Sequence, residues 1–101
     1  MFIYNVTANV SWEIHDSWLI WMKSERIPEM MHLKLFHQYQ MVRLLEIDDS
    51  DGPTYAVQYF TDRKENHERY LLEYLDLHNS HTSKKWGIQI VEFNTLMEIV
   101  Y

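Results

Sequence analysis

The residues from Phe2 to Val10 alternate between two kinds of side chain, and this alternation constrains the fold more than any other feature of the chain. Every second residue from Phe2 onward is apolar, whereas the intervening positions are polar except for Ile3. A period of two is typical of a β-strand with one buried face. Such a strand needs a covering layer on its apolar side, and it presents Asn5, Thr7 and Asn9 on the other side.

The next segment changes to a helical period. Apolar residues recur at helical intervals between Ile14 and Met22, which predicts one stripe of an amphipathic helix. Ser11 offers an oxygen for the N-terminal cap. We expect the helix to end at Ile27-Pro28, because the residue before a proline avoids the helical region. Pro28 suits the start of a short second helical turn, with Glu29 favourably placed in it.

Two strands and a second helix follow. Phe36–Ile47 and Thr54–Phe60 read as strands, joined by the turn cluster Asp48–Pro53. A helical stripe then runs from His67 to His78, and a final strand covers Ile88–Tyr101. The ends of this second helix are marked by Asp62 with Glu65, which predict a capping box, and by Gly87, which suits the left-handed position after the last turn.

The order strand, helix, strand, strand, helix, strand predicts one α+β domain over residues 1–101. Right-handed crossovers turn this order into a four-stranded antiparallel sheet with both helices on one face, the ferredoxin-like βαββαβ sandwich.

Several runs also carry a resemblance to a known family: Tyr4-Asn5-Val6-Thr7, Trp18-Leu19-x-Trp21-Met22-Lys23 leading to Ile27-Pro28-Glu29-Met30, Arg43-Leu44-Leu45, and Thr54-Tyr55-Ala56-Val57-Gln58-Tyr59. On these runs the chain resembles, over nearly its whole length, a small bacterial family known only as a domain of unknown function. That family looks related to the dimeric α+β barrel superfamily, which implies a homodimer with two ferredoxin-like sheets face to face. One departure is Asn79–Ser83, which is more polar than the pattern and leaves the end of the second helix open.

Helices on one face leave the other face of the sheet open. Asn5 and Asn9 should lie on the open face, and so should Gln58, because the heavier set from Tyr55 to Tyr59 belongs to the core. The polar residues of the outer strands are in phase with this set: Gln38, Gln40, Glu92 and Asn94. One interpretation is a solvated or dimer-packed surface. The other is that dimerisation encloses the amides in a polar cavity, where buried amides would need water or a small polar ligand as partners.

His67 is the candidate for chemistry on the helix side. A histidine on an apolar helical stripe is most often a satisfied boundary residue. The resemblance offers a second interpretation, because haem-degrading monooxygenases of the superfamily use an Asn on the first strand, a His on the second helix and a Trp on the third strand. Asn5 or Asn9 and His67 or His78 match the first two, but the third strand has no Trp.

No motif predicts a metal or a cofactor. His78 and His81 lie three residues apart and could face one metal on a helix, but no carboxylate or third histidine has matching spacing. The acidic turn Asp48–Asp51 lacks the remaining ligands of a calcium loop. We therefore expect no metal, no cofactor and no assigned catalytic residue.

Charge and cysteine content exclude further classes. Lys and Arg number 9 against 15 Asp and Glu, a net charge of −6, which disfavours nucleic-acid binding. The absence of cysteine excludes disulfides, thiolate zinc sites and a cysteine nucleophile, and fits a reducing cytoplasm. The chain has no run of apolar residues long enough for a membrane helix, and its first residues do not read as a signal peptide.

Three functions stay open. The first is a non-catalytic cytoplasmic homodimer that binds a small molecule or a protein partner. The second is a small enzyme of the monooxygenase or isomerase kind that works in the cleft between sheet and helices. The third is a metal- or haem-handling protein.

Overall fold

The computed structural model describes all 101 residues, and it has an α+β fold with one antiparallel sheet. Its elements are β1 (Phe2–Val10), α1 (His15–Trp21), a π-helical turn (Met22–Arg26), α2 (Ile27–His32), β2 (Gln38–Arg43), β3 (Thr54–Thr61), α3 (Lys64–Glu73), α4 (Leu75–Trp86), a 3-10 turn (Gly87–Gln89) and β4 (Ile90–Glu98). The strands lie in the order β2-β3-β1-β4, and every neighbouring pair is antiparallel. The predicted α+β class and four-stranded antiparallel sheet are confirmed.

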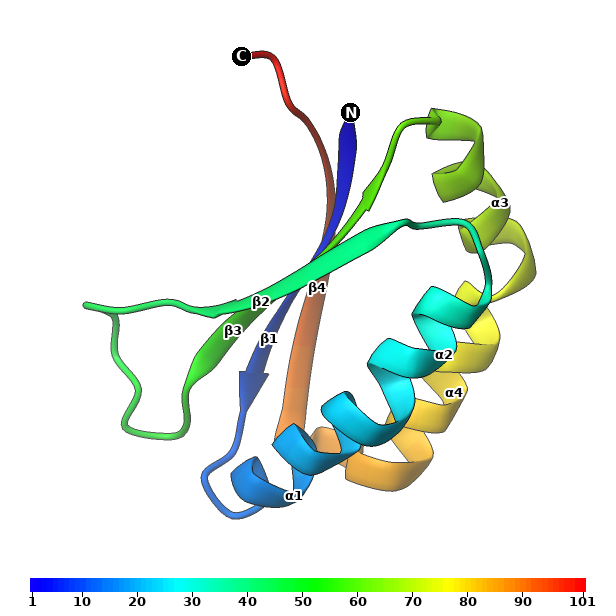
Figure 1. Cartoon of the computed structure of the whole chain (residues 1–101). Coiled ribbons are helices and arrows are strands. Elements are labelled where there is room, and N and C mark those ends of the chain that lie inside the picture. The colour runs from blue at the N-terminus through cyan, green and yellow to red at the C-terminus, as the bar shows by residue number, and fades with distance from the viewer.

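The helical segments lie on one side of the sheet, and the other side is left open (Figure 1). None of the helices is long and apolar enough to cross a membrane. Strand β1 is central, because β3 pairs with one of its edges and β4 with the other.

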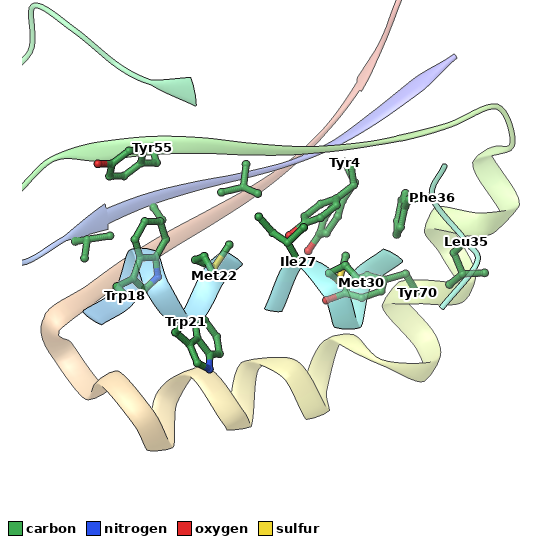
Figure 2. Packing of buried hydrophobic residues seen from close by; sticks show 14 residues of the cluster. Tyr4, Trp18, Trp21, Met22, Ile27, Met30, Leu35, Phe36, Tyr55 and Tyr70 are labelled. Carbon is green, nitrogen blue, oxygen red and sulfur yellow. The ribbon is translucent and has the colours of Figure 1, made fainter. Parts of the chain in front are cut away.

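The core lies between the sheet and the helices. Tyr4 and Val57 come from the two central strands, and Trp18 of α1 is completely buried beneath them. The Trp18 ring lies 5.3 Å from that of Tyr55, and the Tyr4 ring lies 6.0 Å from that of Phe36. Figure 2 shows Tyr4 pointing from β1 toward the helices and Trp18 pointing from α1 toward the sheet. The alternation predicted for β1 and β3 is therefore confirmed.

The helical backbone does not break at Ile27-Pro28, so that part of the prediction was wrong, whereas the short helix α2 does begin with Pro28 and Glu29 in its first turn, as expected. Ile27 has helical backbone angles, φ −64° and ψ −45°, and α2 continues to His32. The π-helical turn explains why the proline is tolerated: one extra residue in the turn before Pro28 widens the helix where the proline ring would meet the preceding turn. The hydroxyl of Ser24 also donates to the Ile20 carbonyl oxygen at 2.7 Å.

Both predicted N-terminal caps were also wrong. The Ser11 hydroxyl accepts a hydrogen bond from the N–H of Glu13, in a turn that precedes the start of α1 at His15. Before α3, the Thr61 hydroxyl accepts a hydrogen bond from the N–H of Arg63 at 3.2 Å, and Asp62 caps nothing. Side-chain bonding to the backbone forms a local turn at both places, which competes with the first helical turn.

Several boundaries differ from the prediction. β4 covers Ile90–Glu98 instead of Ile88–Tyr101, and the predicted second helix is divided at Tyr74 into α3 and α4. β2 ends at Arg43 instead of Ile47, because Glu46 has a positive φ of 60° that an extended strand cannot continue through. α4 runs through the polar stretch Asn79–Ser83 to Trp86, where Gly87 follows with φ 59° as predicted. The Thr82 hydroxyl donates to the His78 carbonyl oxygen at 2.9 Å and supports this stretch from within the helix.

Candidate functional site

A row of polar side chains crosses the centre of the open sheet face. Gln40 of β2, Gln58 of β3, Asn5 of β1 and Thr95 of β4 stand opposite one another, and we call them the amide row. Within the row the Gln40 amide donates to the Gln58 carbonyl oxygen at 2.6 Å. The Asn5 amide donates to the Thr7 hydroxyl at 2.9 Å. Asn5 is buried, and its side-chain oxygen has no hydrogen-bond partner.

The rest of the open face carries apolar or uncharged polar side chains. Phe93 is 65% exposed and Val91 is 51% exposed, both on β4. The remaining residues that share this face by strand register carry no charge either: Gln38, Phe60, Ile3, Met97, Val42, Ala56, Thr7, Thr54 and Asn9. In a chain whose residues are 24% charged, an uncharged face of this extent is suited to contact with another surface.

The other predicted ligand-binding residues lie apart from the amide row. Asn9 is on the same face, but its amide donates to the Gly52 carbonyl oxygen at 3.1 Å and to the Thr54 hydroxyl at 3.0 Å. Asn9 thus fastens the β2–β3 hairpin to β1. His67 is buried on the helix side, with its ring 5.2 Å from that of Tyr4, and burial lowers its pKa.

The monooxygenase-like combination implied by the resemblance is not assembled. Asn5 and Asn9 face away from the helices, whereas His67 and His78 lie among the core side chains on the other side of the sheet. The strand separates the two groups, so one haem could not contact both. His81 is exposed and His78 is buried, so these two histidines do not share an environment either.

Glu92 and Asn94 were expected on the open face, and that prediction was wrong. The register places Glu92 opposite Ala8 and Asn94 opposite Val6, which face the helices. The reason is that the alternation in β4 is weak: the set that contains these two polar residues also contains Ile90 and Leu96. The exposed apolar side chains of β4 therefore point to the open face, and a carboxylate points to the helix side.

A small cavity of about 30 Å³ lies between the helices and the sheet. Arg26 lines it, together with Tyr4, Tyr59, Tyr70 and Glu92, and apolar side chains from α1, the π-helical turn, α2, β1 and β3 complete the wall. Arg26 was not among the residues predicted from the sequence. Its position in the sequence was the available signal. Arg26 stands four residues after Met22 and four before Met30, so a charged residue lies on the stripe of the helix that is otherwise apolar.

Arg26 is only 8% exposed, and its single hydrogen bond runs from Nη2 to the His78 carbonyl oxygen at 3.1 Å. The guanidinium carbon lies 4.6 Å from the centre of the Trp21 ring, which is a cation–π contact. Nε is buried without a partner, and no carboxylate lies within ion-pair distance of the guanidinium. A buried guanidinium with free donors can recognise an anion.

The hydroxyl of Tyr70 lies 2.8 Å from Nδ1 of His78. Burial, with the nearby Arg26 charge, lowers the pKa of His78 to about 4, and burial raises the pKa of Tyr70 to about 12. Near neutral pH the imidazole is therefore uncharged, and it shares one hydrogen bond with the Tyr70 hydroxyl. Desolvation beside the cavity also raises the pKa of Glu92.

This lowered pKa predicts a loss of stability in mild acid. An unfolded histidine takes up a proton near pH 6.5, whereas His78 in the folded state takes it up near pH 4. Above pH 6.5 His78 is neutral in both states and does not lower the free energy of unfolding. As the pH drops toward 4, the proton taken up only by the unfolded state lowers that free energy, by about 3 kcal/mol at most. His78→Asn keeps a δ-position acceptor for Tyr70 and should flatten this slope in denaturant titrations from pH 7 to 4.5. An unchanged slope, with His81→Asn as control, would contradict the assignment.

Comparison with known proteins identifies one family. A family model described as "Domain of unknown function (DUF4286)" matches residues 1–100. No curated protein and no solved structure matches the chain.

Proposed function

The chain belongs to the DUF4286 family of domains of unknown function, and on that premise we propose that it is a homodimeric module that binds a small polar molecule between two sheets. The observation that carries the proposal is the buried side-chain oxygen of Asn5, which has no partner at the centre of an uncharged sheet face. The module acts by binding, without a cofactor. One folding unit over residues 1–101 and a cytoplasmic location belong to the same proposal.

The strand order supports a ferredoxin-like assignment. Read from its β4 edge, the sheet has the order four, one, three, two, and all helical segments cover one face (Figure 1). Two crossovers, from β1 to β2 and from β3 to β4, produce this order, and each passes through the helical layer. A sheet of this kind has one face free to meet a second sheet.

Charge supports a second copy of the chain as the occupant of the open face. Each copy carries −6, so two copies repel unless they meet through a neutral surface. The open face is neutral by register, and it exposes Val91 and Phe93. Amides are donors and acceptors at once, so the amide row is chemically complementary to itself.

The amide row supports a ligand inside that interface. Packing two sheets face to face would bury Asn5, Gln58 and Gln40 completely, and buried amides need hydrogen-bond partners. Gln40 and Gln58 satisfy each other only in part, and the Asn5 oxygen needs a donor. Water or a small molecule with hydroxyl or amide groups meets that need.

A small enzyme of the isomerase or monooxygenase kind is the second candidate. Its support is the Tyr70–His78 pair, which joins two titratable groups at 2.8 Å beside the helix–sheet cavity. His67, the candidate from the sequence, lines none of the cavities.

Light scattering at micromolar concentration tests the dimer. We expect a species of about twice the chain mass of 12.4 kDa. A scattering mass that stays at the value of one chain would overturn the proposal.

A melting experiment with metals, haem, flavins and common polar metabolites tests the ligand. A bound molecule at about 100 times its Kd should raise Tm by roughly 10 to 20 °C. The combined variant Asn5→Leu with Gln58→Leu should abolish a shift that arises at the amide row. Gln38→Leu, an amide on the same face outside the row, is the matched control and should retain it.

A further inference from the structure

Arg26 carries a buried positive charge that forms no ion pair with any side chain of this protein. Removing an unpaired ion from water costs several kcal/mol, so buried charges in proteins are normally paired. The guanidinium has one hydrogen bond, to a neutral carbonyl oxygen, and a cation–π contact with Trp21. Nε is buried and has no hydrogen-bond acceptor. The unpaired guanidinium destabilises the protein when the cavity holds no ligand, and a bound anion would remove that cost by pairing with it.

Glu92 faces the same cavity from the opposite layer. It projects from β4 on the face of the sheet that meets the helices, whereas Arg26 comes from the π-helical turn and its guanidinium contacts Trp21 and the His78 carbonyl oxygen of α4. The two groups lie farther apart than an ion pair, because no oxygen of Glu92 comes within 4.0 Å of a guanidinium nitrogen. Both residues line the cavity of about 30 Å³, in which Arg26 is the buried wall and Glu92 is exposed to solvent. One site thus presents a cation on one wall and a carboxylate on another.

We propose that a small α-amino acid binds here, with its carboxylate in the cavity on the Arg26 guanidinium and its ammonium group on Glu92 at the exposed edge of the cavity. The planar guanidinium fork matches a carboxylate in two parallel hydrogen bonds. The ammonium group supplies the positive charge that Glu92 lacks. Binding therefore neutralises both walls with one molecule.

The tyrosines fit the same chemistry. Tyr4, Tyr59 and Tyr70 line the cavity, and burial raises the pKa of each, so their hydroxyls stay uncharged. Neutral hydroxyls can donate to a carboxylate or accept from an ammonium group. A phosphate dianion is disfavoured, since only one cation is present and Glu92 would repel it.

The space beyond Glu92 restricts the side chain of the ligand. Glu92 also lines a groove of about 280 Å³ between α4 and β4, whose other walls include Asn79, Thr82 and Asn94. The cavity itself admits only a group of a few atoms. The amino acid side chain must therefore lie in the groove, where short polar side chains find hydrogen-bond partners and bulky apolar ones do not.

This site is on the opposite side of the sheet from the amide row, so it does not rest on the proposed function. The two are distinguished by their variants. A ligand shift that is lost in Arg26→Met but survives Asn5→Leu with Gln58→Leu belongs to the helix–sheet cavity. A shift with the reverse dependence belongs to the amide row and would overturn the present inference for that ligand.

Thermal melts and titration calorimetry of the full chain test the site with three matched probes. L-Serine has both charged groups, 3-hydroxypropanoate lacks the ammonium group, and L-serinamide lacks the carboxylate. We expect L-serine to raise Tm, by roughly 10 °C or more at about 100 times its Kd. 3-Hydroxypropanoate should bind at least about tenfold more weakly and L-serinamide not measurably. Glycine, L-threonine and L-asparagine extend the panel.

Two variants separate recognition from folding. Arg26→Met matches the neighbouring methionines and removes an unpaired charge, so it should keep or raise the Tm of the free protein while abolishing the response to L-serine. Glu92→Gln should equalise the affinities for L-serine and 3-hydroxypropanoate, whereas Glu98→Gln on the same strand should change neither. The inference is overturned by no response to any of the four amino acids, by a response that survives Arg26→Met, or by equal binding of 3-hydroxypropanoate to the unmodified protein.

Discussion

Replacing Trp18 with alanine is expected to lower the free energy of unfolding by about 3 to 5 kcal/mol. Trp18 is completely buried, and its ring lies 5.3 Å from that of Tyr55. Its indole joins the first helical segment to the central strands, so alanine would leave a cavity in the middle of the core (Figure 2). For a domain of this size the loss corresponds to a fall in Tm of at least roughly 12 °C.

Ile20→Ala is the matched control for Trp18→Ala. Ile20 lies on the same helix, two residues along, and is 68% exposed. Its replacement should change stability by less than about 0.5 kcal/mol. Urea titrations followed by circular dichroism measure both variants. Equal effects at the two positions would mean that α1 does not pack on the sheet through Trp18.

Replacing Gln58 with glutamate is expected to dissociate the proposed dimer. Gln58 stands between Gln40 and Asn5 in the amide row, so a face-to-face dimer would bury one new carboxylate from each copy. Like charges brought together in an interface cost several kcal/mol, which weakens association by at least roughly a hundredfold. Gln58 is only partly exposed in the single chain, and we expect the monomer to remain folded.

Asn79→Asp introduces the same charge on the exposed surface of α4, in the other layer of the fold. It should leave the dimer intact. Analytical ultracentrifugation over a range of concentrations compares the two variants directly. If Gln58→Glu sediments like the unmodified protein, the second copy does not cover the amide row.

The central strands could be predicted in detail because each has one clearly apolar face. In β1 and β3 the alternation is strong enough that only one register buries Tyr4, Val57 and Tyr59 together. The same alternation placed Asn5 and Gln58 on the open face. A one-residue shift would have moved every core side chain into water, so the pattern specifies the register.

The register of β4 could not be predicted, because both of its faces mix apolar and polar residues. The sequence pattern favours neither orientation of Glu92, and only pairing with β1 decides it. Arg26 was missed for a related reason: a charge inside a helical stripe reads as a surface residue until the opposing layer is known. Both residues of the proposed amino acid site are therefore exceptions to the patterns that identified the fold.

The helix ends depended on local hydrogen bonds that a sequence pattern does not resolve. Ser11 and Asp62 are good capping residues, but the chain uses Ser11 and Thr61 for tight turns instead. Pro28 is a good helix stop, but a π-helical turn accommodates it. The π-helical turn also carries Arg26. The same turn that lets the helix continue past Pro28 therefore positions the positively charged wall of the cavity.

The central place of β1 constrains how the protein can be made in the cell. Its partners, residues 54–61 and 90–98, are both translated later, so the two edges of β1 lack their hydrogen-bonding neighbours while the ribosome adds them. At ordinary elongation rates the interval before β3 is synthesised is roughly 2 to 9 s. Native pairing on both edges must be completed after β4 emerges, which favours late, cooperative folding and a nascent chain that benefits from a chaperone.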